Sequence, residues 1–286
     1  MTRVEIVYRF ADDASGSHIR PHTPVDARSA LNRGNQDFAA LFASTGDDGH
    51  VRREIAIDQR DLGLLATADT PLKQVPFAAI LGCADARVPV ELIFNKGPND
   101  LFVVRVAGNT LGDDVLGSLK YAVEQLRESL KLIVVLGHSG CGAVTAAVDV
   151  FLNPSRYLSL ASSHAIRMLV DRLQVAVHVA ALRIESEYGA TAGAHPRYRE
   201  LLIEMAVLMN AALAAHTLRQ SISLIKGADV GTAYGVYVLS DRLVWAPRAG
   251  DDEGLGVAPP PDRAQDFVDL AASALRSKRM TDLLSA

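Results

Sequence analysis

Short apolar runs alternate with stretches of helical periodicity through the middle of the chain. Runs at 77–81, 101–106 and 132–136 predict buried strands, because a strand covered on both faces loses its polar alternation. Between the second and third runs, apolar residues spaced three or four apart from Val115 to Leu130 predict an amphipathic helix. Strands that alternate with helices in this way are typical of a parallel sheet with helices on both faces.

Outside this central region the patterns are weaker, and residues 51–74 fit no element. A loop is expected at 45–50, and Pro and Gly at 246–263 predict a linker. The other expected elements are a strand at 4–10, a helix from 26, a short helix at 89–94, a helix from about 141, a helical block at 160–220 whose second helix starts at Pro196, a hairpin of 234–239 with 243–246, and a last helix at 265–279.

These elements predict an α/β fold with a mostly parallel sheet, about four parallel strands plus an antiparallel edge strand, flanked by helices. An N-terminal helical arm and a C-terminal extension are expected at its two ends. We predict three regions. They are an arm with helices at 1–75, expected to wrap a partner, an α/β domain with the candidate chemistry at 76–246, and a linker with a C-terminal helix at 247–286.

Composition narrows the classes of function. With 286 residues, 49% of them hydrophobic, the chain can bury a large core, and a net charge of -4 argues against a nucleic-acid partner. The longest stretch free of charge, 132–148, contains three glycines and a histidine, so we expect no membrane span there. Two cysteines are too few for a disulfide framework, and residues 1–5 lack the pattern of a secretion signal. We therefore expect a cytoplasmic protein.

Both cysteines follow predicted strands. Cys83 lies directly after the first apolar run, and His138 and Cys141 lie directly after the third. In a doubly wound sheet these two strands are neighbours, and ligands bind at their carboxyl ends, so the three side chains should converge. Two cysteines and one histidine are the ligand set of a catalytic zinc site whose fourth position is open to water.

Other interpretations stay open at this point. The three residues could simply be buried in the core, or the cysteines could form a disulfide, which the missing secretion signal disfavours. Asp85 could instead close a structural zinc site as a fourth ligand. Asp85 and Arg87 could be an ordinary surface ion pair, or Asp85 could orient a zinc-bound hydroxide while Arg87 keeps Asp85 ionised and off the metal. The remaining histidines lie at no tight metal spacing.

With these residues in view, the sequence resembles the β-class carbonic anhydrases. The family pattern Cys-x-Asp-x-Arg, followed by His-x-x-Cys, is matched at 83–87 and 138–141. The stretches 102–109 and 134–138 and the motif Gly34-Asn35-x-x-Phe38 are also similar to that family. The likeness is close over 75–150 and looser at 30–45 and 195–245. The long helical block and the tail after 246 depart from it.

The resemblance implies one zinc ion per subunit, bound by Cys83, His138 and Cys141, with Asp85 and Arg87 as the catalytic pair beside it. It implies reversible hydration of carbon dioxide to bicarbonate by zinc-bound hydroxide. Because two thiolate ligands weaken the acidification of water by zinc, we expect the activity to grow towards alkaline pH. The resemblance also implies a homodimer or dimer of dimers. Two alternatives remain: a carbon disulfide or carbonyl sulfide hydrolase on the same scaffold, and a non-catalytic bicarbonate-sensing or structural zinc protein.

Overall fold

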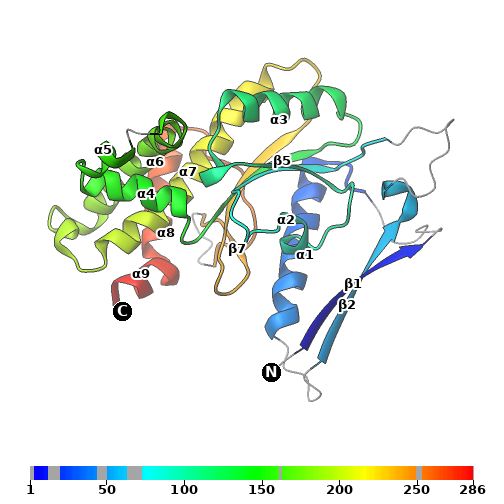
Figure 1. The fold of residues 1–286 in the computed structure, drawn as a ribbon, viewed down its shortest axis with the longest axis horizontal. Coiled ribbons are helices and arrows are strands. Elements are labelled where there is room, and N and C mark those ends of the chain that lie inside the picture. The colour runs from blue at the N-terminus through cyan, green and yellow to red at the C-terminus, as the bar shows by residue number, and fades with distance from the viewer. Residues whose placement is uncertain are drawn as a thin grey trace.

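A five-stranded sheet forms the centre of the computed structural model, which describes residues 3–11, 20–43, 50–62, 73–160, 163–248 and 253–285 (Figure 1). Its strands are β3 (Ala78–Gly82), β4 (Leu101–Arg105), β5 (Leu132–His138), β6 (Gly231–Tyr237) and β7 (Val244–Trp245). They lie in the order β4-β3-β5-β6-β7, with the first four parallel and β7 antiparallel to β6. The predicted sheet is confirmed, including its antiparallel edge strand.

The two central strands are buried on both faces, which explains their continuous apolar runs. Every residue of β3 and β5 is buried. Alternate residues enter different cores: Ala79 and Ile133 pack into one hydrophobic cluster, and Ile80 and Val134 pack into the other. The sheet therefore carries a helical layer on each face.

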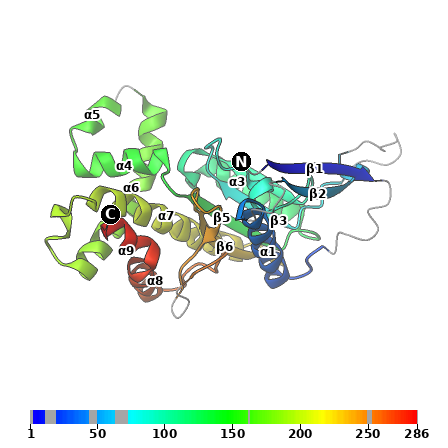
Figure 2. The same cartoon turned by 90° about the horizontal axis from the view of Figure 1, so that it is seen from below.

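Helices cover both faces of the sheet (Figure 2). The helices are α1 (Pro24–Ala43), α2 (Val90–Ile93), α3 (Asp113–Gln125), α4 (Gly142–Leu152), α5 (Arg156–Leu160), α6 (His164–Tyr188), α7 (Tyr198–Ser223), α8 (Ala264–Arg276) and α9 (Lys278–Ser285), with short 3-10 turns at Gln59–Leu62, Ala107–Asn109 and Ala192–Ala194. Helices α1 and α2 pack on one face, and the longer helices after β4 pack on the other. The C-terminal pair α8 and α9 contacts α6 and α7.

Several predicted helix boundaries are wrong by a few residues. The apolar pattern that continues to Leu130 predicted a helix that is too long, because α3 ends at Gln125. Leu130 is buried in the turn before β5. The helix expected from Pro196 begins at Tyr198. The single predicted C-terminal helix is two helices, because Ser277 adopts an extended ψ of 150° between α8 and α9.

The N-terminal region contains a second, two-stranded sheet. Strand β1 (Arg3–Ala11), predicted at 4–10, pairs in parallel with β2 (His50–Asp58), and α1 lies between them in the chain. Strand β2 lies in the stretch that fitted no element, because its alternation of charged and apolar residues is irregular. A loop was predicted at 45–50. Its last residue, His50, is the first residue of β2, and 45–49 lie outside the described residues.

The tail after β7 packs against the rest of the protein. Bridges join Trp245 to Leu255 and Tyr234 to Ala258, so the described end of the predicted linker extends the sheet edge. In α8 and α9, Leu275 and Met280 are fully buried in the core cluster that also covers β5. The three-region division stays a prediction, and the packing shows that the C-terminal region shares its core with the sheet.

Helix α7 is the one helix among the described residues that is long and apolar enough to cross a membrane. Of its most apolar 18-residue window, 78% is buried inside the molecule. Such burial is typical of a core helix.

Candidate metal centre

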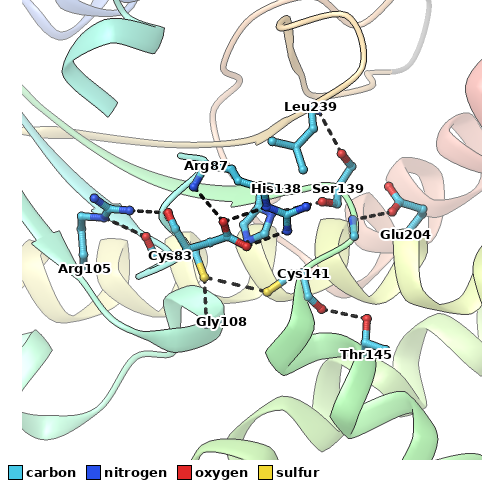
Figure 3. A network of polar contacts seen from close by, with 12 residues as sticks. Cys83, Arg87, Arg105, Gly108, His138, Ser139, Cys141, Thr145, Glu204 and Leu239 are labelled. Atoms are coloured by element: carbon cyan, nitrogen blue, oxygen red, sulfur yellow. Dashed lines mark hydrogen bonds and ion pairs between the residues drawn. The ribbon is translucent and has the colours of Figure 1, made fainter. Parts of the chain in front are cut away.

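The two cysteines and His138 converge at the carboxyl ends of β3 and β5 (Figure 3). Cys83 follows β3, His138 is the last residue of β5, and Cys141 immediately precedes α4. Their ligand atoms lie within 4.8 Å of one another, and all three residues are buried. The two Sγ atoms are 3.9 Å apart and both thiols are free, which excludes the disulfide interpretation for this structure. The predicted convergence is confirmed.

His138 presents an unpartnered ring nitrogen to this cluster. Its Nδ1 lies 3.1 Å from the carbonyl oxygen of Ser139, and because a carbonyl only accepts, Nδ1 carries the proton. The Nε2 atom therefore offers a lone pair, is completely buried and has no hydrogen-bond partner. A buried polar atom without a partner is costly, and a metal ion would satisfy it. Two thiol sulfurs and this nitrogen fit zinc in both number and chemistry.

Contacts from the neighbouring strand β4 and the turn after it hold the Cys83 loop. Arg105 donates to two backbone carbonyls of the loop, to Cys83 O at 2.9 Å through Nε and to Asp85 O through Nη2. The Gly108 N–H donates to Cys83 Sγ at 3.3 Å, and Asn210 holds Gly108 by donating to its carbonyl at 2.9 Å. Donation to sulfur favours the thiolate, which is the form that binds metal.

Different elements hold the Cys141 loop. Strand β6 and the residues after it provide two hydrogen bonds: Ser139 N donates to Tyr237 O at 3.0 Å, and Leu239 N donates to Ser139 Oγ at 3.0 Å. Helix α7 provides a third, because Gly140 N donates to Glu204 Oε1 at 2.8 Å. Cys141 is the N-cap residue of α4, yet its side chain makes no capping hydrogen bond. Its sulfur is therefore available to a metal ion at the positive end of the helix dipole.

The two thiols differ in protonation. The pKa of Cys83 is lowered, chiefly because the Cys141 thiol donates towards its sulfur, with a smaller contribution from the Gly108 N–H. The pKa of Cys141 is raised, because its proton is held in that bond and because the residue is buried. The two thiols are therefore unequal, and Cys83 loses its proton more readily than Cys141.

Asp85 and Arg87 form a bidentate ion pair beside this cluster. Arg87 Nε lies 3.0 Å from Asp85 Oδ1, Arg87 Nη2 lies 2.7 Å from Oδ2, and the Arg87 backbone N–H also donates to Oδ1. These bonds lower the pKa of Asp85, and they raise the pKa of Arg87. Asp85 Oδ2 is 3.8 Å from His138 Nε2, so an ionised carboxylate stands next to the candidate metal position.

Sequence reasoning missed the residues that hold the two loops. Arg105 and Gly108 lie in the stretch that resembled the family, but nothing local revealed their bonds to Cys83 and Asp85. Glu204 and Asn210 lie on α7, 64 and 102 residues from the groups they bind, so no local pattern could have identified them.

The other described histidines lie in several elements, and His50, expected in a loop, is the first residue of β2. Among the described residues, the Cys83, His138 and Cys141 group is the one set of His, Cys, Asp or Glu with metal-binding geometry. In the helical block, His178 and His216 instead direct Nδ1 to the backbone carbonyls of Gln174 and Pro261. His18 lies outside the described residues.

Comparisons with known proteins agree with this geometry. The carbonic anhydrase family model matches residues 78–225, which are 148 of the 286 residues and include all five site residues. The chain belongs to the β-class carbonic anhydrases. Carbonic anhydrase 2 of Mycobacterium tuberculosis is 46% identical over 129 residues, which cover 45% of this chain and 55% of that protein.

A second relative and a solved structure extend the comparison. Carbonic anhydrase of Mycolicibacterium smegmatis is 41% identical over 129 residues, covering 44% of this chain and 53% of that protein. The chain thus spans about half the length of the curated relatives it matches. The solved β-carbonic anhydrase of Coccomyxa, in complex with acetazolamide, superimposes with a TM-score of 0.51 and 20% identity over 86% of this chain and 96% of that one. That likeness shows the fold.

Proposed function

We propose that this protein is a zinc carbonic anhydrase that hydrates carbon dioxide reversibly to bicarbonate and a proton. The observation that carries the proposal is the buried, unpartnered Nε2 of His138 beside the two cysteine sulfurs. Cys83, His138 and Cys141 would hold one zinc ion per subunit. When bound, zinc would act as a Lewis acid that lowers the pKa of water at its open position. Membership of the β-class family supports the same assignment.

Asp85 would hold the reacting water in position. Its carboxylate can only accept hydrogen bonds while it is ionised, and the lowered pKa keeps it ionised at neutral and alkaline pH. A carboxylate oxygen 3.8 Å from His138 Nε2 can accept a hydrogen bond from a water molecule beside the metal position and orient a lone pair of that water towards carbon dioxide. Asp85 thus acts as an acceptor, and the product proton passes to solvent.

Arg87 would keep Asp85 in this role. Its guanidinium engages both carboxylate oxygens, and three of its hydrogen bonds to Asp85 are 3.0 Å or shorter. A carboxylate bound in this way is held back from becoming a fourth metal ligand, which favours the open site over the closed structural one. An exposed ion pair contributes little to folding stability, so the value of this pair lies in its position.

Assembly and location belong to the same proposal. We infer a homodimer or dimer of dimers, because a two-stranded sheet such as β1–β2 is marginally stable alone and two of its aromatic side chains, Tyr8 and Phe10, are exposed. We infer a cytoplasmic location, because a reducing compartment would keep both cysteines as free thiols that can bind a metal ion.

Oxygen-isotope exchange between carbon dioxide and water tests the proposed reaction. Zinc-loaded protein should catalyse the exchange between about pH 7 and pH 9, with the rate rising towards alkaline pH because thiolate ligands weaken the acidification of water by zinc. The His138→Ala variant, measured at the same protein concentration, is the control and should be inactive. No exchange by fully zinc-loaded protein at any pH would contradict the proposal. Sulfide release from carbon disulfide without exchange would instead favour the hydrolase alternative.

A further inference from the structure

Glu204 is a charged residue in an otherwise apolar stretch of helix α7. The residues on both sides of it, Ile203 and Met205, are buried, and the Glu204 side chain itself is only 12% exposed. Withdrawing a carboxylate from water is unfavourable unless hydrogen bonds compensate it. The contacts of Glu204 therefore indicate why a carboxylate is present on this core helix.

Each carboxylate oxygen of Glu204 has its own partner. Oε1 accepts the Gly140 N–H at 2.8 Å, within the loop that joins His138 to Cys141 (Figure 3). Oε2 accepts from Arg279 Nη2 at 2.5 Å. Gly140 has a φ of +62°, so its N–H is directed by a backbone conformation in which the loop turns sharply between the two ligands. A charged acceptor makes this bond stronger than an amide–carbonyl pair.

Arg279 lies in α9, beyond the residues that match the family model. Its side chain is 22% exposed, and its guanidinium lies 5.7 Å from the ring centroid of the buried Trp245 on β7. The next residue, Met280, is fully buried and anchors α9 in the core. Arg279 is therefore fixed by packing on one side and by Glu204 on the other.

We propose that Arg279 and Glu204 are positioning residues that couple the C-terminal helix to the metal-ligand loop. Through the chain Arg279–Glu204–Gly140, α9 holds the loop so that His138 and Cys141 face Cys83 in the geometry that retains the metal ion. The C-terminal extension thereby completes the metal centre from outside the part of the chain that resembles the family. This inference rests on the proposed zinc site, and its readout is metal retention.

Four variants test the coupling. Glu204→Ala removes both contacts, Glu204→Gln keeps an oxygen that can accept the Gly140 N–H, and Arg279→Met keeps the aliphatic stem but removes the charge. Arg276→Met is the matched control, because it removes another arginine of the C-terminal region. Arg276 pairs with Glu187 on α6 at 3.7 Å and not with a residue that holds the ligand loop. The measurements are the rate of zinc transfer to a chelator, the visible spectrum of the cobalt-substituted protein and the midpoint of thermal unfolding.

We expect a graded loss of metal retention. Glu204→Ala should release zinc about tenfold faster or more, the lower end of the effect of residues that orient metal ligands, and Arg279→Met several-fold faster. Glu204→Gln should recover part of the loss, and Arg276→Met should stay within about twofold of the wild type. The cobalt spectrum should change in Glu204→Ala and Arg279→Met, because ligand geometry sets its bands, and should remain unchanged in Arg276→Met.

Two outcomes would overturn the coupling. One is zinc release within twofold of the wild type in both Arg279→Met and Glu204→Gln, a comparison that stands even if Glu204→Ala does not fold. The other is faster release in Arg279→Met and Arg276→Met alike, in proportion to their lower unfolding midpoints, because that would indicate general loosening of the C-terminal region. If zinc release is graded as expected but the wild type catalyses no isotope exchange, the coupling is supported and the proposed reaction is refuted.

Discussion

The two halves of the candidate metal centre, the loop of Cys83 and the loop from His138 to Cys141, are held in different ways. The Cys83 half is held mainly by its neighbour in sequence and sheet, since Arg105 and Gly108 lie 22 and 25 residues away from Cys83. The loop of the Cys141 half is held by Glu204, 64 residues from Gly140, and by Leu239, 100 residues from Ser139. The first half is thus built mainly within one strand–helix–strand unit and the turn that follows it, whereas the second depends on helix α7 and on β6 with the residues after it.

The two halves should therefore be sensitive to changes in different parts of the chain. Changes within the 78–112 region should act on the Cys83 half directly. The Cys141 half should respond to changes far away in the chain, including the C-terminal helices.

Loss of a ligand from either half should have the largest effect. Cys83→Ser and Cys141→Ser should each weaken zinc binding by roughly a hundredfold or more and abolish exchange activity, because a hydroxyl replaces a thiolate at a three-ligand site. Equal losses would show that the halves hold the same ion. Zinc content after dialysis against a chelator measures this, and full zinc retention by either variant would refute a shared site.

Asp85→Asn should separate catalysis from metal binding within the Cys83 half. The amide keeps the size of the side chain but can no longer be a charged acceptor that orients water, so exchange activity should fall by about 10²-fold while zinc content stays that of the wild type. Because the bonds from Arg87 lower the pKa of Asp85, the carboxylate stays ionised above its unfolded pKa and is protonated only as the pH falls through the lower folded value.

The corresponding pH measurement follows the Asp85 carboxyl signal by NMR in protein labelled with ¹³C at aspartate. No protonation should be seen between pH 5 and 9. A titration near neutral pH would contradict the assigned role. The Asp113→Asn variant, which changes an aspartate in the first turn of α3 outside the metal cluster, serves as the control for a general effect of losing one carboxylate.

Each half of the site has one glycine with a left-handed backbone beside it, and these two glycines allow a direct comparison of the halves. Gly108 has a φ of +67°, and a Cβ there would lie 3.1 Å from Ala143 Cβ and 3.2 Å from Leu173 Cδ1; Gly140 has a φ of +62° and open space around it. Gly108→Ala should therefore lower the free energy of unfolding by about 2–3 kcal/mol and Gly140→Ala by about 1 kcal/mol. Urea unfolding of the metal-free proteins measures both, and an equal or reversed order would contradict the packing argument.

Zinc binding should also reveal the different protonation of the two thiols. Because the pKa of Cys83 is lowered and that of Cys141 is raised, the metal-free pair carries one thiol proton at neutral pH, and binding should release about one proton from the pair where two free thiols would release about two. The apparent zinc affinity should then rise about tenfold per pH unit below the pKa of Cys141. Proton release into two buffers of different ionisation enthalpy, followed by calorimetry, measures this. Release of two protons from the thiols would contradict it.

The sequence predicted the parts of the fold that depend on local pattern. The apolar runs of β3 and β5 identified the buried centre of the sheet, and the switch-point rule placed Cys83 beside His138 and Cys141 across 58 residues. Strand β2 was not predicted, because its charged residues interrupt any regular alternation of apolar positions. Its partner, β1, lies 47 residues earlier in the chain. The end of α3 was misplaced because Leu126 and Leu130 are apolar for a turn that packs on the core, and that turn is not helical.

The residues of the site divide in the same way into those that the sequence identified and those that it did not. The ligands and the Asp85–Arg87 pair stand in short motifs whose chemistry is visible in the sequence. Glu204, Asn210 and Arg279 make long-range contacts. Glu204 and Asn210 interrupt an apolar stretch of the sequence, but no local pattern identifies the groups that they bind. The orientation of His138 likewise depends on a backbone carbonyl, Ser139 O, that carries no side-chain signal.

Zinc K-edge X-ray absorption on the zinc-loaded protein near pH 8 would identify the donor atoms around the metal ion. We expect two sulfur donors at about 2.3 Å and two lighter donors at about 2.0–2.1 Å, one of them a histidine nitrogen and the other a solvent oxygen. The spectrum should be unchanged in Asp85→Asn, because the carboxylate is not a ligand. Fewer than two sulfur donors, or the loss of a light donor in Asp85→Asn, would contradict a site formed by both loops with an open fourth position.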